Sequence, residues 1–338
     1  MSIATFGNRW EIIKPISEGG QAQIYHVKNL KVHDNKTYVL KKLKKGQRKA
    51  RFETEIEAIK SIDSPYIEKI IDFNIISGKD FYYVMPYYSE KTLESILNSL
   101  GGEFIRSLKI FVKICKGIQD AHIKEIPIIH RDLKPLNILI DDNDDPRIID
   151  FGICYLDAPE RITLSQEQVG SRFYIAPECE IGKSKDIGRH TDIYSLGKIL
   201  YAMISGGRIF PRERQNEDEY NLKKIMTDKR VKYVTQIIDC CVKEKIVERF
   251  ENITDLLSIV EENIRLIEAG FFPVNYGDEF CRFCGKGKLK EFGQLKGSIL
   301  KSGSLTQDIS PWGIKFWGCP QCGIVFLFKD DIYKTHKD

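Results

Sequence analysis

Hydrophobic residues in the first part of the chain follow the short spacing that is typical of β-strands. Apolar and β-branched residues predict strands over residues 10–16, 23–28, 38–41 and 81–85. Between the third and fourth of these strands, Ile56 and Ile59 define the apolar face of a helix predicted over residues 52–62. The first part of the chain is therefore expected to be rich in strands, with one helix.

After this part, the apolar residues recur at the three- and four-residue spacing of helices. A long core helix is predicted from Ile105, Leu108, Phe111, Val112, Cys115 and Ile118. Further core helices are predicted from residue 192 to about 204, over residues 234–241 and over residues 253–267. The predicted strands thus come first in the chain, and the predicted core helices follow them.

A polar loop interrupts this pattern at residues 130–137, between the apolar residues 128–129 and 138–140. The pattern predicts a loop between two short buried strands. A loop with Arg, Asp, Lys and Asn at this density is expected to face a cleft; the alternative is a hairpin whose charges are solvated. Asp150 follows a further apolar run, thirteen residues after Asn137.

The side chains of these two segments suit a particular chemistry. Asp132 can accept a proton from an attacking hydroxyl group. Asn137 and Asp150 offer oxygen ligands, which suit hard cations such as Mg2+ or Mn2+. The eight residues 130–137, followed at this distance by Asp150-Phe151-Gly152, resemble the catalytic loop and the metal-binding motif of protein kinases. The resemblance implies an α+β fold of two lobes, the first rich in strands and the second helical, and phosphoryl transfer from ATP.

The resemblance extends to the predicted strands and helix of the first part. It implies that Lys41 reaches the phosphates of ATP and that a carboxylate on the following helix holds this lysine. The family pattern places the partner ten residues before Pro65, which gives Glu55. Glu53 and Glu57 are the neighbouring alternatives.

Residues 17–22 resemble the glycine-rich loop that folds over the phosphates, where small residues let backbone N–H groups approach the oxygens. Ser17 and Ala22 occupy the family's first and third glycine positions, so the match is partial and a plain hairpin turn is the alternative. Met85 stands at the gatekeeper position, and residues 86–88 stand at the hinge. The residues implied to contact the nucleotide or its metal are Ser17, Gly19, Gly20, Ala22, Ile24, Val39, Lys41, Met85, Pro86, Tyr87, Tyr88, Asn137, Leu139 and Asp150.

The resemblance also indicates the class of acceptor. It gives Asp132 the role of catalytic base and lets Lys134 stabilise charge on the transferred group. Lys134 and Ser171 are typical of serine/threonine kinases, because tyrosine kinases place other residues two positions after the catalytic aspartate. The expected acceptor is therefore a Ser or Thr hydroxyl on a protein.

Residues 150–178 resemble the activation loop of the family. Arg131 can pair with a phosphate group, which suggests control by phosphorylation of this loop. Thr163 and Ser165 are the candidate acceptors; the alternative is that both are ordinary loop hydroxyls.

Two further matches lie in the helical part. Glu178 ends an Ala-Pro-Glu triplet, and the family places its buried cationic partner at the position of Arg249. Asp192 corresponds to the aspartate that holds the backbone of the catalytic loop. The resemblance covers about residues 8 to 268, with all motifs in the family's order.

The nine cysteines are unevenly distributed, and four of them form two Cys-x-x-Cys pairs near the end of the chain. Between the pairs Cys281/Cys284 and Cys319/Cys322 lie 34 residues, and each pair is followed directly by a glycine. This pattern resembles the two knuckles of a zinc ribbon, in which four thiolates form a closed, structural zinc site. An iron centre, a redox dithiol and a disulfide are the alternatives.

The role of the ribbon is open at the level of the sequence. Residues 271–338 contain ten Lys/Arg and seven Asp/Glu, a net charge of 10 − 7 = +3. Trp312, Phe316 and Trp317 could stack on nucleic-acid bases. A docking module for a protein partner would carry a similarly small charge, so both kinds of partner remain candidates.

Composition sets the remaining limits. The formal net charge of +4 over 338 residues does not by itself imply a nucleic-acid partner. Residues 1–10 lack the pattern of a signal peptide, and apolar runs are too short to span a membrane, so a soluble, cytoplasmic protein is expected.

The sequence thus predicts an ATP-dependent serine/threonine kinase domain at residues 1–269, with lobes at about 8–85 and 89–268. A zinc-ribbon module is predicted at residues 270–338. The alternative function is a pseudokinase scaffold, whose usual mark is the loss of the lysine, the catalytic aspartate or the metal-binding aspartate. Lys41, Asp132 and Asp150 are all present.

Overall fold

The structure is a computed structural model, and it describes most of the first 270 residues and three strands beyond them. The described residues are 5–18, 22–32, 36–44, 49–76, 79–151, 172–179, 186–270, 290–295, 314–318 and 325–329. The chain divides into two compact units, residues 1–271 and residues 272–338.

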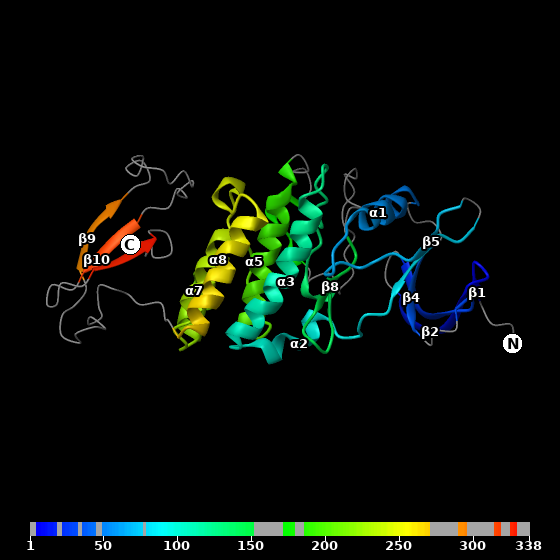
Figure 1. The fold of residues 1–338 in the computed structure, drawn as a ribbon, viewed down its shortest axis with the longest axis horizontal. Coiled ribbons are helices and arrows are strands. Elements are labelled where there is room, and N and C mark those ends of the chain that lie inside the picture. Colours follow the sequence, from blue (N-terminus) through cyan, green and yellow to red (C-terminus); the bar gives the residue numbers. More distant parts are fainter. Residues whose placement is uncertain are drawn as a thin grey trace. The chain divides into compact units, whose positions relative to one another are not determined.

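The first unit begins with a six-stranded antiparallel sheet, in the order β1-β2-β3-β4-β6-β5 (Figure 1). Its strands are β1 Thr5–Phe6, β2 Trp10–Glu18, β3 Ala22–Asn29, β4 Tyr38–Leu43, β5 Asp72–Asn74 and β6 Tyr82–Pro86. Strands that are neighbours in the sequence also pair in the sheet, with one exception. β4 pairs with β6 rather than with β5, and helix α1 (Lys49–Ser61) and β5 lie between β4 and β6 in the chain. All four predicted strands and the predicted helix are therefore present in this lobe.

The two faces of this sheet bury different sets of side chains, because successive residues of a strand point to opposite faces. On one face, Val39 and Met85 pack with Phe52 and Ile56 of helix α1. On the other face, Leu40 packs with a separate apolar cluster that includes Trp10, Val27, Tyr82 and Val84. The alternation places Lys41 on the same face as Val39, toward α1.

The described residues of the first unit that follow this sheet are mostly helical. Its helices are α2 Leu93–Leu100, α3 Phe104–His122, α5 Arg189–Ser205, α6 Leu222–Ile225, α7 Val231–Cys241 and α8 Ile253–Glu268. Thr92 and Asn252 cap α2 and α8, since their side-chain oxygens accept backbone N–H bonds. Figure 1 shows α3, α5, α7 and α8 side by side in this lobe, and most residues of α5 are buried. Helix α5 is thus the centre of the helical lobe.

Close packing of α5 on α7 depends on a glycine. A Cβ atom added at Gly197 would lie 2.4 Å from Cβ of Cys241 and 2.8 Å from a methyl group of Val242. Contacts this short do not occur between real carbon atoms, so any larger residue would push the two helices apart.

A short hairpin carries the end of the catalytic loop. Strands β7 (Ile138–Ile140) and β8 (Pro146–Ile148) pair with each other, and the 3-10 helix η1 (Pro135–Asn137) precedes them. Residues 141–145 form the turn between these strands, and the last two carboxylates of the turn make ion pairs. Asp144 pairs with Arg106 at 2.8 Å, and Asp145 pairs with Lys113 at 2.5 Å, both from α3.

In the second unit the structure describes a three-stranded antiparallel sheet in the order β11-β10-β9. Its strands are β9 Lys290–Leu295, β10 Ile314–Gly318 and β11 Val325–Lys329. Gly318, the last residue of β10, pairs with Val325 at the start of β11 and with Lys290 at the start of β9. The apolar residues at 316–317 and 324–328 predict two strands, and both are present as β10 and β11, whereas the sequence pattern does not predict β9.

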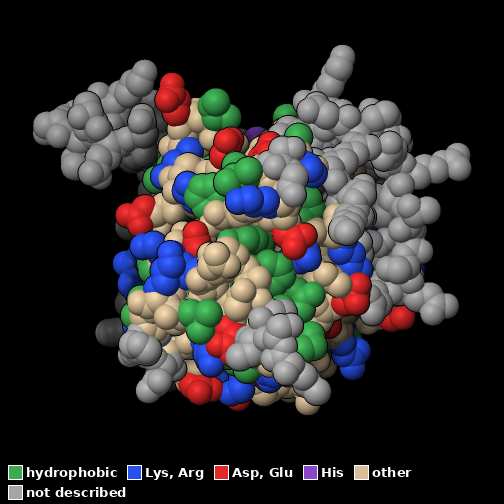
Figure 2. Space-filling model, turned by 90° about the vertical axis from the view of Figure 1, so that its right-hand side faces the viewer, with side chains coloured by type: hydrophobic (Ala, Val, Ile, Leu, Met, Phe, Trp, Pro, Cys, Tyr) green, Lys and Arg blue, Asp and Glu red, His purple; other side chains and the backbone are tan. Residues whose placement is uncertain are grey.

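The described surface carries charges of both signs. Figure 2 shows one face of the molecule, on which Lys and Arg side chains are interspersed with Asp and Glu side chains and with hydrophobic groups. Among the described helices, none combines the length and the apolar character that crossing a membrane requires.

Candidate active site

A buried carboxylate, that of Asp192, holds the backbone at the start of the polar loop 130–137. Asp192, near the start of α5, accepts the backbone N–H groups of His130 and Arg131, each at 2.9 Å. Its third contact partner is Nε2 of His122, at 2.8 Å. Burial alone would raise the pKa of Asp192, but the contact with His122 and the other donors lowers it below the usual value. The predicted anchoring by Asp192 is therefore present as hydrogen bonds.

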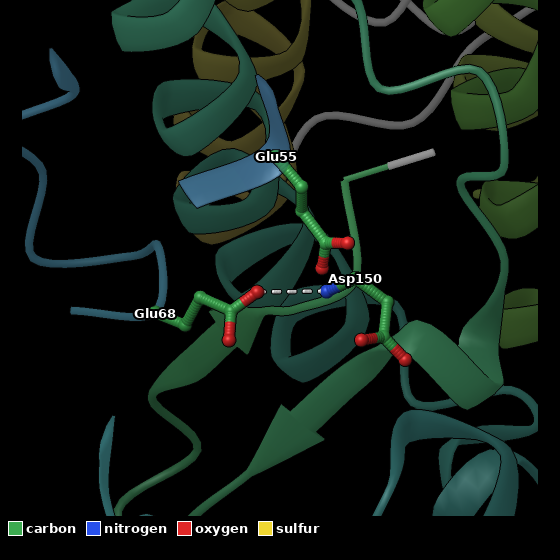
Figure 3. Close-up of side chains that lie close together, drawn as sticks. All are labelled: Glu55, Glu68 and Asp150. Atoms are coloured by element: carbon green, nitrogen blue, oxygen red, sulfur yellow. Dashed lines mark hydrogen bonds between the residues drawn. The ribbon is translucent and has the colours of Figure 1, made fainter. Parts of the chain in front are cut away.

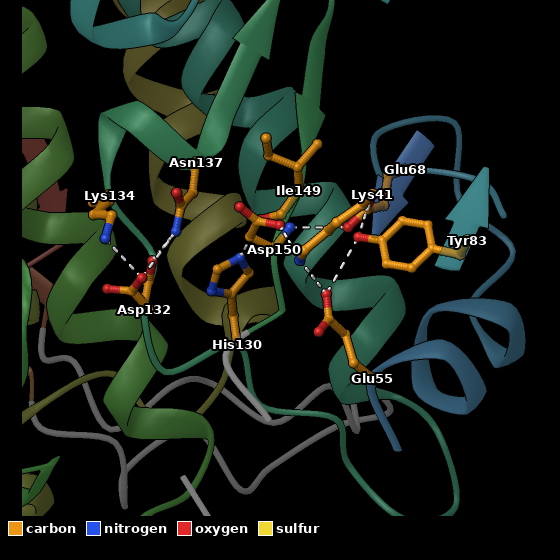
Figure 4. Close-up of polar contacts among 10 residues, drawn as sticks. All are labelled: Lys41, Glu55, Glu68, Tyr83, His130, Asp132, Lys134, Asn137, Ile149 and Asp150. Carbon is orange, nitrogen blue, oxygen red and sulfur yellow. Dashed lines mark hydrogen bonds and ion pairs between the residues drawn. The ribbon is translucent and has the colours of Figure 1, made fainter. Parts of the chain in front are cut away.

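Asp132 lies at the centre of a small polar cluster. Lys134 Nζ contacts Asp132 Oδ2 at 2.7 Å, and Asn137 Nδ2 donates to the Asp132 carbonyl at 2.8 Å and to Oδ2 at 3.1 Å. Figure 4 shows the three side chains pointing toward one another. The bonds hold the carboxylate in one orientation while leaving its side chain 27% exposed, so it remains open to an acceptor.

Lys41 lies between two carboxylates from distant parts of the chain. Its Nζ is 2.7 Å from Glu55 Oε1 on α1 and 2.6 Å from Asp150 Oδ1 (Figure 4). Burial favours the neutral amine, but the charges of Asp150 and Glu55 outweigh it and raise the pKa of Lys41 well above its usual value. Glu55, rather than Glu53 or Glu57, is the partner that contacts Lys41.

The peptide bond between Ile149 and Asp150 is held at both of its polar atoms. The carbonyl oxygen of Ile149 is 3.1 Å from Nε2 of His130, and the N–H of Asp150 donates to Glu68 Oε1 at 2.9 Å. Asp150 has a φ of 58°, in the left-handed region that non-glycine residues rarely adopt. Phe151 packs against the ring of His130, with centroids 4.7 Å apart.

Glu68 and Tyr83 complete this site, and no motif in the sequence predicted either residue as part of it. Glu68 Oε2 lies 3.3 Å from the Tyr83 hydroxyl, which is also 3.3 Å from Glu55 Oε1. Figure 3 shows the carboxylates of Glu55, Glu68 and Asp150 close together. Burial, with the negative charge of Asp150, raises the pKa of Glu68 to about 8. In the sequence Glu68 stands beside Lys69 and looks like an ordinary surface charge.

The walls expected around the adenine base come from the sheet and the segment after β6. Ala22, Val39 and Met85 are buried, and Ile24 and Leu139 are partly buried. The N–H of Tyr87 donates to the carbonyl of Thr37 at 3.3 Å, and the Tyr88 hydroxyl accepts a bond from the N–H of Lys69 at 2.9 Å. Pro86 ends β6, and Ser17 is an exposed residue of β2.

Several predicted residues lie outside the described part of the chain. They are Gly19, Gly20, Thr163, Ser165, Ser171, Cys281, Cys284, Cys319 and Cys322.

The ion pair expected after the activation segment is described in full. Arg249 Nη1 and Nη2 contact Glu178 Oε1 and Oε2 at 2.6 and 3.0 Å, and both side chains are buried. The hydroxyl of Thr191 also donates to Glu178, at 3.0 Å. This two-pronged bond fixes the end of the segment to the helical lobe.

The arrangement as a whole has the parts that phosphoryl transfer requires. A buried cation, Lys41, lies next to a carboxylate, Asp150, and a second carboxylate, Asp132, is oriented on the neighbouring loop. The oxygen donors of Asn137 and Asp150 suit Mg2+ in chemical type, since this ion prefers carboxylate and amide oxygens.

Comparison with known proteins agrees with this geometry. The protein kinase domain model matches residues 10–267. A probable serine/threonine-protein kinase of Clostridium acetobutylicum is 30% identical over 293 residues, which are 81% of this chain and 42% of that protein. One of Clostridium perfringens is 32% identical over 207 residues, 59% of this chain and 29% of that protein.

A solved structure gives the same result for the fold. The crystal structure of the Mycobacterium tuberculosis PknI kinase domain matches with a TM-score of 0.55 and 17% identity, covering 78% of this chain and 99% of that chain. The chain thus spans less than half of the two clostridial relatives but nearly all of a solved kinase domain. The two-lobed fold, the site geometry and the family model together show that the chain belongs to the protein kinase family.

Proposed function

We propose that this protein is a serine/threonine protein kinase that transfers the γ-phosphoryl group of ATP to hydroxyl groups of protein substrates. The observation that carries the proposal is the simultaneous presence of two ordered clusters. Lys41 is paired with Glu55 and Asp150, and Asp132 is paired with Lys134 and Asn137. Family membership and the names of the relatives support it.

In the proposed reaction, Asp132 orients the substrate hydroxyl and takes its proton as the oxygen attacks the γ-phosphorus. A new O–P bond forms, the bond from the γ-phosphorus to the β,γ-bridging oxygen breaks, and ADP leaves with that bonding electron pair. Lys134, 2.7 Å from Asp132, places a positive charge beside the transferred group. Most of the rate enhancement in such a site comes from positioning and from fixed charges.

The nucleotide is proposed to bind under the sheet, with Lys41 on its phosphates and Glu55 holding that lysine in place. Asn137 and Asp150 would hold Mg2+, whose charge neutralises the phosphate oxygens when it is bound. The hinge at residues 86–88 would bond the adenine through its backbone, while Ala22, Val39 and Met85 form apolar walls. Serine or threonine as acceptor follows from Lys134 and from the resemblance at Ser171.

A structural zinc ribbon is part of the same proposal. The described strand ends beside the two cysteine pairs support it: Gly318 precedes Cys319, Val325 follows Cys322, and Lys290 lies six residues after Cys284. Gly318 pairs with both Val325 and Lys290, so the three residues lie at the same end of the sheet. Four thiolates brought to that end would form a closed tetrahedral site for Zn2+. The ribbon's proposed role is to recruit a protein or nucleic-acid partner.

The experiment that tests the main proposal is phosphoryl transfer by the purified protein. With Mg2+ and radiolabelled ATP, the protein should label itself or a generic protein substrate on serine or threonine. Phosphoamino-acid analysis identifies the acceptor, and phosphotyrosine as the main product would refute the class. A wild-type protein that binds ATP but transfers no phosphate would favour the pseudokinase alternative.

A further inference from the structure

The strongest unassigned feature of the molecule is the carboxylate of Glu68, which the roles proposed above do not use. Its residue is 2% exposed, on the segment between α1 and β5. Each oxygen has a described partner: Oε1 accepts the N–H of Asp150 at 2.9 Å, and Oε2 lies 3.3 Å from the Tyr83 hydroxyl. A carboxylate that is buried and bonded at both ends is oriented by its surroundings and orients them in turn.

The first partner is a strained part of the backbone. Asp150 holds a φ of 58°, which costs a non-glycine residue free energy unless neighbouring groups impose it. The His130 ring contacts the carbonyl oxygen of the preceding residue, Ile149, at 3.1 Å, and Glu68 holds the N–H of the same peptide unit. With both polar atoms engaged, this peptide cannot rotate without breaking two hydrogen bonds (Figure 4). Its orientation decides where the Asp150 carboxylate points.

The second partner leads to the phosphate-binding lysine. The Tyr83 hydroxyl lies 3.3 Å from Glu68 and 3.3 Å from Glu55, and Glu55 contacts Lys41 at 2.7 Å. A chain of polar contacts therefore connects the Asp150 backbone to Lys41 through the interior of the N-terminal lobe. Figures 3 and 4 show these groups converging from helix α1, strand β6 and the two loops.

The apolar side chains around Tyr83 indicate that packing alone does not require the polar pair Glu68 and Tyr83 at this place. Tyr83 is on the sheet face that buries Val39, Phe52, Ile56 and Met85, all apolar. Burying a polar carboxyl group beside this apolar cluster costs free energy that burying a leucine does not. An apolar residue at position 68 would fill the space, but it would leave the N–H of Asp150 without its acceptor.

We propose that Glu68 and Tyr83 are positioning residues for phosphoryl transfer. They fix the Ile149–Asp150 peptide so that the Asp150 carboxylate faces Lys41 and the proposed Mg2+ site. Glu68 acts on the metal-binding aspartate through its backbone. Tyr83 transmits the position of helix α1, through Glu55, to the same point. The inference rests on the proposed kinase activity.

The test compares variants that keep or remove the hydrogen bonds. Glu68→Leu removes both and should lower kcat and raise the Mg2+ concentration needed for half-maximal rate, each by roughly 10-fold. Glu68→Gln keeps an oxygen for the Asp150 N–H and offers an N–H to Tyr83, so it should recover most of the activity. Tyr83→Phe keeps the Glu68–Asp150 bond and should show a smaller, few-fold effect.

Strand β6 supplies a matched control. Tyr82 is also buried, but it lies on the opposite sheet face with Trp10, Leu40 and Val84. Tyr82→Phe should therefore leave kcat and the Mg2+ requirement unchanged. Thermal unfolding of each variant establishes that the fold is intact.

A second readout does not depend on turnover. Calorimetric titration with ADP, with and without Mg2+, measures how much the metal adds to nucleotide affinity. This increment should fall in Glu68→Leu and persist in Glu68→Gln.

Wild-type behaviour of Glu68→Leu in both readouts, or an equal loss in the Leu and Gln variants, would overturn the inference. If Glu68→Leu does not fold, the other two variants decide. The inference fails if Glu68→Gln loses activity, or if Tyr83→Phe behaves like the control Tyr82→Phe. Failure of the proposed function would look different, as a wild-type protein without phosphoryl transfer.

Discussion

At the scale of single residues, the site depends on a few polar side chains that are held by other polar side chains. Asp132 has bonds from Lys134 and Asn137, and Lys41 has two carboxylates within 2.7 Å. Each contact restricts a side chain that would otherwise sample several rotamers. Such preorganisation is what lets fixed charges act on a reaction without reorganising during it.

The first prediction concerns Asp132. Asp132→Asn keeps the size of the side chain and can still bond Asn137, but it removes the base that takes the hydroxyl proton. We expect phosphoryl transfer to fall by on the order of 10²-fold or more, while ATP binding and thermal stability stay near wild type. Rate measurements under saturating ATP, with binding measured separately, check this. Near-normal turnover would remove Asp132 from the mechanism.

The second prediction concerns Lys198, a lysine in the middle of the central helix α5. Its Nζ donates to the carbonyl oxygens of Phe210 and Arg212 at 2.7 and 2.8 Å, and two N–H donors are what a neutral amine provides. Burial lowers the pKa of Lys198 to about 7, while the Glu213 carboxylate acts in the opposite direction. In the unfolded chain the pKa of a lysine is about 10.4.

The sign follows from proton counting. Between pH 7 and pH 10, unfolded Lys198 binds a proton that folded Lys198 does not, so the free energy of unfolding should rise with pH. The slope from this group is at most about 1.4 kcal/mol per pH unit. Urea denaturation between pH 6.5 and 9.5 should show this rise in the wild type and a weaker one in Lys198→Met. If the free energy of unfolding changed equally with pH in the two proteins, the lowered pKa of Lys198 would be contradicted.

Residue by residue, the sequence predicts what a family motif carries and misses what only the fold brings together. Lys41, Glu55 and Asp150 could be paired because their spacing matches a known pattern. Glu68 and Tyr83 could not, because the burial of a polar residue depends on distant segments. Lys198 is a similar case, since it lies in an apolar helix where a charge is unexpected.

At the scale of elements, the hydrophobic pattern predicts which segments form and is less accurate about their ends. Helix α1 begins at Lys49, three residues before the predicted start, because its basic first turn contributes no apolar signal. Strand β9 was missed because Lys290–Leu295 mixes charged residues and a glycine with only two large apolar residues. Pairing with β10 determines this strand, and pairing is not visible in its own sequence.

The third prediction concerns the packing of α5 on α7. Gly197→Ala places a methyl group 2.4 Å from Cβ of Cys241, so the helices must separate. We expect a loss of about 1–3 kcal/mol in the free energy of unfolding, measured by urea denaturation. Gly188, at the start of the same helix, has no heavy atom within 4 Å of an added Cβ. Gly188→Ser is therefore the control and should be neutral; equal effects would show that the close contact is relieved at little cost.

At the scale of the whole molecule, the chain has two compact units, residues 1–271 and 272–338, and the family model ends at residue 267. Every residue of the candidate active site lies in the first unit, which has its own apolar core on both sides of the sheet and between the helices. A unit with its own core is expected to fold without its neighbour. The second unit is small, so a metal would supply much of its folding free energy.

The last prediction tests this independence together with the proposed zinc site. The protein should carry one tightly bound zinc per chain, and Cys319→Ser should lose it. Limited proteolysis should then cut the variant after about residue 272. Residues 1–271 should stay resistant, because none of the four cysteines belongs to the candidate active site. Cys115→Ser is a control for thiol loss, since Cys115 is buried in α3 and should leave the zinc content unchanged.

Truncation before Phe271 then separates recruitment from regulation. If the ribbon recruits a partner, the shortened protein should phosphorylate a small peptide at the full rate and a native target more slowly. An equal loss on both substrates would mean that the ribbon acts on the kinase domain itself. Intact protein without zinc, measured by elemental analysis, would rule out the four-cysteine site regardless of either result.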